Sequence, residues 1–261
     1  MHLKSATIVL AISTAAFALP AQTLTPLHAK CSLSRARDTS KFSLHVSDGD
    51  ECPTDNHCGS NFDTESTSRF TGITVTDLDR DGAHVIATLA DEAGTFTCTG
   101  TVHDGELYGD ALFTPDSAFV DRMAKLGFMG YDSQKLLAYT LLNVTSEYAQ
   151  SLQQADIRGV TTDNLIALRI FKVDPAYARA FVSMGYEQPD AEKLIALKVQ
   201  GVNADEVRQI RALGFQPTLD ELIQIRIFHI TPDFIHRMQD RGFKNLSIAK
   251  LVQIRIFNLA E

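Results

Sequence analysis

The chain has 261 residues, of which 44% are hydrophobic and 21% charged, and its formal net charge is −8. This is ordinary globular composition, which excludes a mostly disordered, collagen-like or low-complexity chain, and the length corresponds to about 1.7 domains. The net negative charge argues against a general nucleic-acid binder, because such a protein needs a basic face to neutralise phosphates.

Residues 1–29 have the pattern of a bacterial secretory signal peptide. Lys4 supplies a short positive region, and residues 6–19 form a run of apolar and small residues that is too short to span a bilayer comfortably. A small-x-small cleavage signal occurs at residues 16–18, and residues 19–21 and 27–29 are later options for cleavage. An uncleaved membrane anchor is the alternative. Because no other stretch approaches 18 apolar residues, we expect a periplasmic or secreted protein without a membrane span after cleavage.

Four cysteines, Cys31, Cys52, Cys58 and Cys98, all lie in the first 98 residues. An even number in an exported, loop-rich segment favours disulfides over metal ligation. Three pairings exist. We favour Cys52–Cys58, which closes a short loop rich in turn residues, and this leaves Cys31–Cys98 to tie the start of the mature chain to a strand. A zinc site that includes His57 is the alternative, but paired C-x2-C spacing is missing.

Residues 30–115 are predicted to form an acidic β-module. Residues 1–115 carry 7 Lys and Arg against 15 Asp and Glu, whereas residues 116–261 carry 17 of each. The dipeptides Asp81-Gly82 and Asp104-Gly105 favour tight hairpin turns. We expect a disulfide-stapled antiparallel meander of four or five strands within residues 40–114. The expected strands are rich in β-branched and aromatic residues, and they cover residues 42–46, 69–76, 83–90, 95–103 and 106–113.

Residues 116–261 contain an internal repeat of 29 residues, which is the strongest pattern in the sequence. The units are 116–144, 145–173, 174–202, 203–230 and 231–259. Each unit opens with a residue type preferred at helix N-caps: Asp116, Thr145, Asp174, Asn203 and Thr231. Four first helices are expected to end at a glycine followed by an aromatic residue: Gly127-Phe128, Gly185-Tyr186, Gly214-Phe215 and Gly242-Phe243. The second unit has Asp156-Ile157 instead, so its first helix is expected to run on or to end differently.

A second helix in each unit begins after a second cap, four residues before a leucine. These caps are Asp132, Thr161, Asp190, Thr218 and Ser247. The second helix is apolar nearly all round, which indicates burial on several sides, whereas the first helix is amphipathic. One hairpin cannot bury this surface alone, and stacking of neighbours solves the problem. The fold class that we predict is α+β, with the small antiparallel β-module followed by a short α-solenoid of five helical hairpins.

The repeat resembles one found in uncharacterised exported bacterial proteins. The residues that carry the resemblance are 231–243, with the sequence TPDFIHRMQDRGF, and 251–257, with the sequence LVQIRIF. In some relatives similar repeats follow a β-lactam-sensor-like membrane metallopeptidase, but its zinc motif H-E-x-x-H is absent here, so no protease activity is implied. Residues 92–96, with Gly100, Gly109 and Phe113, resemble a small β-module that precedes the repeats in such proteins. The resemblance covers about residues 90–259, and residues 31–66 have no counterpart.

One candidate cation site lies in the acidic module. Asp77, Asp79 and Asp81, followed by Gly82, match the first half of a calcium-binding loop, but position 12 is Thr88 where a bidentate glutamate is needed. Hairpin turns also favour Asp and Gly. An acidic turn is therefore our first interpretation and a weak calcium site the alternative.

One position of the second helices forms a basic row. It holds Arg169, Lys198, Arg226 and Arg255, with Thr140 in the first unit. These side chains are candidates for binding an acidic partner segment. The competing interpretation is that each stem packs while its head bonds a neighbouring carbonyl or carboxylate. Another row, Phe171, Phe228 and Phe257, is expected to pack between repeats or to line a hydrophobic groove.

The leading hypothesis is a non-enzymatic extracytoplasmic interaction or scaffold protein that binds a protein or peptide partner, because helical repeats present extended surfaces. This step is an analogy from architecture. The sequence contains no G-x-S-x-G, P-loop or G-x-G-x-x-G motif, and no catalytic residue is assigned. The alternatives are a calcium-binding or structural envelope protein, and a carboxylate-dependent hydrolase with a site between the two halves. Apart from calcium, no cofactor is expected.

Overall fold

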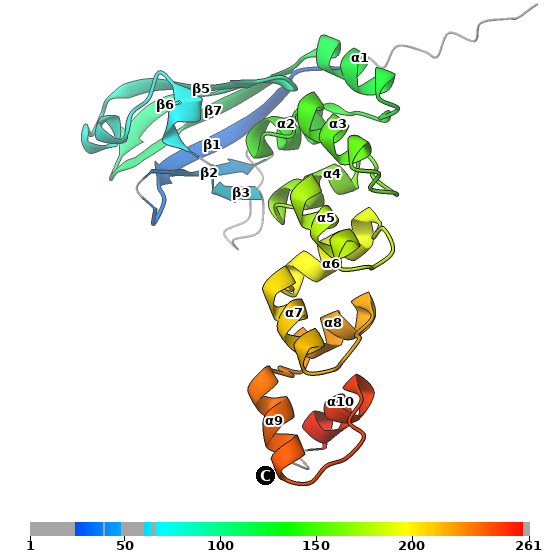
Figure 1. Cartoon of the computed structure of the whole chain (residues 1–261). Coiled ribbons are helices and arrows are strands. Elements are labelled where there is room, and N and C mark those ends of the chain that lie inside the picture. Colours follow the sequence, from blue (N-terminus) through cyan, green and yellow to red (C-terminus); the bar gives the residue numbers. More distant parts are fainter. Residues whose placement is uncertain (1–23, 39, 48–59, 64–65, 258–261) are drawn as a thin grey trace, which may run out of the picture.

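The computed structural model describes residues 24–38, 40–47, 60–63 and 66–257, and it places one antiparallel sheet before ten α-helices (Figure 1). The predicted α+β class is confirmed. Cys52 and Cys58 lie outside the described residues, as do residues 1–23 of the predicted leader. Among the described residues, no helix has the length and apolar character needed to cross a bilayer.

The sheet has seven strands in the order β3-β2-β1-β7-β6-β5-β4. Strands β4 to β7 lie side by side and form the later part of the predicted meander. The predicted strand at residues 42–46 is present as β2, but it pairs with β1 and β3 and not with β4. Strands β1 and β3 are additions to the predicted set. The strands are β1 (Leu27–Arg35), β2 (Phe42–Ser47), β3 (Ser60–Asp63), β4 (Phe70–Thr71), β5 (His84–Asp91), β6 (Gly94–His103) and β7 (Glu106–Pro115).

Strand β1 is the main feature of the sheet that the sequence analysis missed. It lies between β2 and β7, and its first three residues, which were assigned to the leader, pair with residues 111–113 of β7. The β-module therefore begins at least at Leu27, before the predicted boundary at residue 30. The leader pattern hid this strand because one of its cleavage signals, residues 27–29, overlaps the start of β1.

The predicted strand at residues 69–76 is wrong over most of its length. Only Phe70–Thr71 pairs with β5. Gly72 then adopts a φ of 77°, and the backbone N–H of Thr74 donates a hydrogen bond to Asp77 Oδ2 at 2.6 Å. This local cap begins the short 3-10 helix Val75–Asp79, which replaces the strand.

The two predicted hairpin turns have different outcomes. Asp104 and Gly105 have φ values of 52° and 81° and connect β6 to β7, as expected for a tight hairpin. The dipeptide Asp81-Gly82 instead follows the 3-10 helix and leads into β5, so it does not close a hairpin. The structure corrects this second prediction because the residues before Asp81 do not continue as a paired strand.

The predicted disulfide between Cys31 and Cys98 is confirmed, with a Cα–Cα distance of 6.0 Å. It joins β1 to β6 across the intervening strand β7. Gly109 faces Cys31 in the strand register and also faces Gly100. A Cβ atom on Gly109 would lie 2.0 Å from the Thr99 carbonyl oxygen, so only glycine permits this close approach of the strands.

The helical repeats expected after residue 115 are present, with two helices per unit. The first helices of the units are α1 (Ser117–Lys125), α3 (Ser146–Gln154), α5 (Pro175–Ser183), α7 (Ala204–Ala212) and α9 (Pro232–Asp240). The second helices are α2 (Ser133–Leu142), α4 (Asn164–Ile170), α6 (Ala191–Val199), α8 (Leu219–Ile227) and α10 (Ile248–Ile256).

Local capping explains why the helices begin and end where they do. Nine of the ten predicted N-caps precede their helix directly and accept a hydrogen bond from its first turn. Thr161 instead accepts from Asn164, the first residue of α4. The four predicted C-terminal glycines have φ values between 84° and 89°, and Asp156 adopts the same left-handed conformation in the second unit, with φ 54°. The second unit therefore ends its first helix as the others do, although it lacks the glycine.

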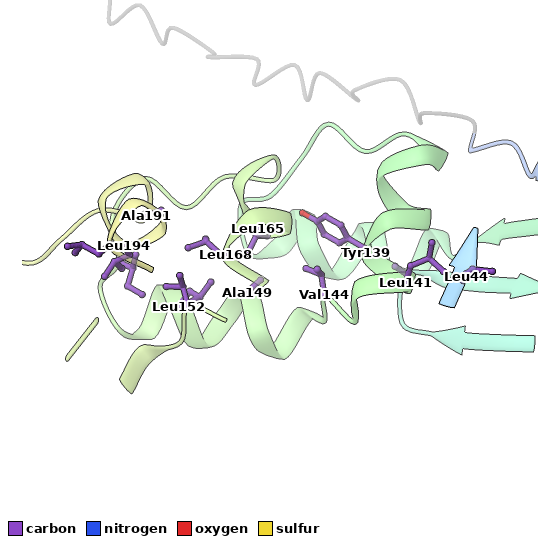
Figure 2. Close-up of a cluster of buried hydrophobic side chains, with 14 of the residues drawn as sticks. Leu44, Tyr139, Leu141, Val144, Ala149, Leu152, Leu165, Leu168, Ala191 and Leu194 are labelled. Carbon is purple, nitrogen blue, oxygen red and sulfur yellow. The ribbon is translucent and has the colours of Figure 1, made fainter. Parts of the chain in front are cut away.

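Each even-numbered helix packs against the next one, and α2 also packs on β5, β6 and β7. The helices follow one another in a stack that leads away from the sheet (Figure 1). Buried side chains continue from the sheet into this stack. Figure 2 shows Leu44 of β2 beside Leu141 of α2, then Leu165 and Leu168 of α4 and Leu194 of α6. The sheet and the first repeats therefore share one apolar core.

Candidate functional site

The last residues of the even-numbered helices form a row of exposed aliphatic side chains. Ile170, Val199, Ile227 and Ile256 occupy the same repeat position, and between 49% and 54% of each residue is exposed. We call these four residues the aliphatic column. Because consecutive even-numbered helices pack against one another, these equivalent residues lie at the same end of four neighbouring helices, α4 to α10.

The same repeat position in the first unit is covered. Its residue is Leu141 of α2, which is only 2% exposed and lies beside Leu44 of the sheet (Figure 2). In the first unit this residue is therefore buried against the β-module, whereas in units two to five the equivalent residue is about half exposed to solvent. The aliphatic column is the continuation of the surface on which the β-module is docked.

A largely buried ion pair lies where this docked module meets α2. Arg69 Nη2 lies 2.6 Å from Asp91 Oδ2, and the two side chains are 17% and 13% exposed. Arg69 also donates to the backbone carbonyls of Thr140, at 2.8 Å, and Leu141, at 3.1 Å. A cation suits this end of α2 because the helix dipole places partial negative charge on its last carbonyls.

The β5–β6 turn brings acidic side chains to the second unit. With its amide turned so that the nitrogen faces Asp91, Asn143 donates to Asp91 Oδ2 at 3.0 Å and accepts from Arg169 Nη2 at 3.1 Å. Glu92 accepts hydrogen bonds from the backbone N–H of Ser146, at 3.1 Å, and from its hydroxyl, at 2.6 Å. A carboxylate at this helix start complements the positive end of the dipole of α3. The turn therefore reaches Arg169 through the Asn143 amide and supplies a carboxylate, that of Glu92, directly to a helix N-terminus.

The predicted basic row lies directly beside the aliphatic column, and its members bind neighbouring helix ends. Arg169 Nε donates to the Leu142 carbonyl at 3.1 Å, and Arg226 Nε donates to the Gln200 carbonyl at 3.0 Å. Arg255 Nη2 donates to the His229 carbonyl at 3.1 Å. Each of these arginines thus caps the C-terminal end of the preceding even-numbered helix, as the packing interpretation expected. A partner-binding role for the row stays a prediction.

The heads of three basic side chains in the row also lie over aromatic rings of their own unit. Arg169 lies 5.4 Å from the Tyr148 ring centroid, Lys198 4.2 Å from that of Tyr177, and Arg255 3.9 Å from that of Phe234. In the fourth unit Glu206 takes the place of the ring, and Arg226 Nη1 pairs with its carboxylate at 3.1 Å.

The first unit is the exception in this row, since it has Thr140 in place of a cation. Thr140 is fully buried, and its carbonyl accepts from Arg69 of the β-module. The module therefore provides the cation that the helices of the later units provide themselves.

Tyrosine side chains close individual units by long-range hydrogen bonds. Tyr148 donates to the Val173 carbonyl at 2.7 Å, and Tyr177 donates to the Val202 carbonyl at 2.8 Å. Burial raises the pKa of both phenols well above the usual value, so both remain neutral donors at physiological pH. These contacts make the tyrosines structural.

The predicted phenylalanine row is unevenly exposed. Phe228 is partly buried against the core, Phe171 is 39% exposed and Phe257 is 67% exposed. Exposure is highest at Phe257, at the end of the last described helix, where no further repeat of the described chain covers the side chain. Packing between repeats therefore accounts for Phe228, while Phe257 lies on the surface.

The three aspartates of the calcium candidate have separate partners. Asp77 binds Thr74 and Arg80, Asp79 lies 2.5 Å from Arg35 Nη2, and Asp81 accepts from the backbone N–H of Asp104 at 3.3 Å. Hydrogen bonds from the hydroxyl and backbone N–H of Thr74 lower the pKa of Asp77. Within the described ranges, no group of three or more His, Cys, Asp or Glu side chains could hold a metal ion.

Sequence reasoning missed the aliphatic column and the docking pair Arg69–Asp91. The column was visible as a fixed aliphatic residue directly after each cation, but a helix that is apolar nearly all round does not reveal which side chain remains exposed. Arg69 and Asp91 are 22 residues apart, and no local motif connects them.

Comparisons with protein-family models, curated proteins and solved structures found no match for this chain.

Proposed function

We propose that this protein is an exported, non-enzymatic partner-binding protein whose repeats form a short α-solenoid of five helical hairpins. The observation that carries the binding proposal is the aliphatic column: Ile170, Val199, Ile227 and Ile256 are about half exposed, in register with a residue that the β-module buries. Aligned aliphatic side chains on a soluble surface are typical of interaction sites, and stacked helical repeats present such surfaces to proteins and peptides.

The solenoid is supported by the packing of the even-numbered helices. Every even-numbered helix contacts the next one, and the arginine caps join successive units. Two ion pairs add to this connection, Lys135 with Asp163 at 2.7 Å, and Lys193 with Asp220. Interactions between nearest neighbours are what stabilise a repeat stack.

Export is supported by the leader pattern and by the Cys31–Cys98 disulfide, because disulfides persist mainly in oxidising compartments. Strand β1 begins at Leu27, so cleavage after Ala29 would remove three paired residues. We therefore expect cleavage at one of the two earlier signals, after Ala18 or Ala21. Intact-mass measurement of protein secreted with its own leader checks this expectation. A chain that keeps residue 1, or that starts at residue 30, contradicts it.

Site-specific photo-crosslinking tests the binding proposal. A photoreactive residue at position 199 lies in the aliphatic column, whereas the same residue at position 182 replaces Val182, an exposed apolar residue of α5 that is 41% exposed and outside the column. In the envelope of the producing cell, we expect a defined heteromeric adduct from position 199 and none from position 182. Equal labelling from both positions, or none from either, would count against partner binding through this surface.

A further inference from the structure

We propose that the aliphatic column, together with the flanking cations Lys198, Arg226 and Arg255, binds an extended segment of another protein that combines aliphatic and acidic side chains. This proposal rests on the proposed partner-binding function and names the chemistry of the partner. The occupant is a protein segment, and a second copy of this chain is the outcome that the test must exclude.

Continuity with the docked β-module indicates where the partner binds. The module covers Leu141, the first member of the repeat position, and leaves Ile170, Val199, Ile227 and Ile256 about half exposed along the same line of helices. A segment that covers the remaining positions would therefore gain the same kind of apolar contact that the module gains at Leu141.

The module does not set the charge of the partner, because it brings its own cation, Arg69, to the first position of the row, where Arg69 pairs with Asp91. Asp91 reaches Arg169, the first cation supplied by the helices, through the amide of Asn143. The charge expected of the partner therefore follows from the later cations of the row.

Two of the later cations have no carboxylate partner within the described part of the chain. Lys198 lies over the Tyr177 ring, and Arg255 lies over the Phe234 ring and donates to a backbone carbonyl. Among the described residues, Arg226 differs from these two cations because it pairs with a carboxylate, that of Glu206. An acidic side chain beside Val199 or Ile256 would therefore meet an adjacent positive charge that no carboxylate of the described residues pairs with.

The spacing of the column favours an extended segment. Packed helices lie about 8–10 Å apart, and an extended chain in the polyproline II conformation covers about 9 Å in three residues, after which its side chains point in the same direction again. An extended segment that places an aliphatic residue at every third position therefore matches the line of even-numbered helices. Its intervening residues reach the neighbouring cations, which is where acidic side chains are expected.

The experiment uses the full mature chain and a phage-displayed library of random peptides. We expect the selected peptides to carry aliphatic residues about three positions apart, with Asp or Glu between them. A selected peptide is then synthesised, and its affinity is measured by fluorescence polarisation against Val199→Asp, Lys198→Glu and the matched control Val182→Asp. Val199→Asp and Lys198→Glu are each expected to weaken binding of the peptide about tenfold relative to the unmodified chain, whereas Val182→Asp changes the affinity less than about twofold. Circular dichroism verifies that all three variants remain folded.

Other outcomes overturn the proposal in distinguishable ways. Peptides that bind with unchanged affinity to Val199→Asp would place the binding surface elsewhere, so this inference fails while the partner-binding function stands. Selection of basic peptides refutes the assigned charge. Light scattering that shows a dimer which Val199→Asp dissociates would make a second copy the occupant. If no peptide binds and position 199 gives no crosslink, both the inference and the proposed function fail.

Discussion

Replacement of Arg69 by alanine is expected to be the most damaging single change at the junction between the sheet and the helices. The substitution leaves the Asp91 carboxylate, which is 13% exposed, without its cation, and it removes two hydrogen bonds to the end of α2. Removal of one partner from a buried ion pair costs about 3–5 kcal/mol. Because both side chains retain a little solvent contact and Asn143 remains close to Asp91, we expect about 3 kcal/mol for Arg69→Ala.

The matched control is Lys30→Ala. Lys30 Nζ lies 2.7 Å from Asp110 Oδ1, almost the same separation as in the buried pair, but these side chains are 49% and 77% exposed. An exposed pair of this kind contributes at most about 1 kcal/mol. The two variants therefore separate the effect of burial from that of distance.

Urea unfolding followed by circular dichroism at 222 nm measures both variants, because the signal reports the helices and the chain contains no tryptophan for a fluorescence probe. We expect Arg69→Ala to lower the free energy of unfolding far more than Lys30→Ala. We also expect Asp91→Asn to recover part of the loss in the double variant, since it removes the unpaired charge. Equal stabilities of Arg69→Ala and Lys30→Ala would show that this junction does not couple the two halves.

Three further predictions concern stability. Replacing Cys31 and Cys98 together by serine removes a cross-link between residues 67 positions apart and should destabilise the chain by about 4 kcal/mol in thermal or urea unfolding; a loss below about 1 kcal/mol would contradict the loop-entropy argument. Lys172, at the end of α4, has a φ of 53°, and the third unit has Gly201 at the equivalent position. Because this left-handed conformation is strained for residues other than glycine, Lys172→Gly should raise the free energy of unfolding by about 0.5–1 kcal/mol. A lower melting temperature of the variant would refute this. Burial raises the pKa of Tyr131 to about 12. Above about pH 10 the phenol loses its proton in the unfolded chain but keeps it in the folded chain. The free energy of unfolding therefore falls between about pH 10 and pH 12. Tyr131→Phe should make that fall less steep, and an unchanged slope would show that Tyr131 does not contribute to it.

Local interactions explain most of what was predictable. The caps Asp116 and Thr218 each accept from their own helix, and the left-handed position after the first helix of a unit falls at Gly127 and, in the second unit, at Asp156. These interactions involve residues a few positions apart, so the pattern of residue types determines them wherever the unit lies. The Asp104-Gly105 hairpin was predictable for the same reason, since both residues adopt positive φ.

The amino-acid sequence by itself therefore determined the repeat, its two helices per unit and the meander of the later strands, and it favoured the bridge between Cys31 and Cys98. Only the tertiary structure decided that β1 enters the sheet beside β7 and that Arg69 reaches the end of α2. It also decided which copies of one repeat position are covered: Leu141 and Ile170 are equivalent in the sequence, but only Leu141 has a sheet packed over it. The physical reason is that the burial of a side chain depends on which distant segment of the chain packs against it. A pattern that repeats every 29 residues is the same in every unit, so it does not specify which unit the sheet contacts.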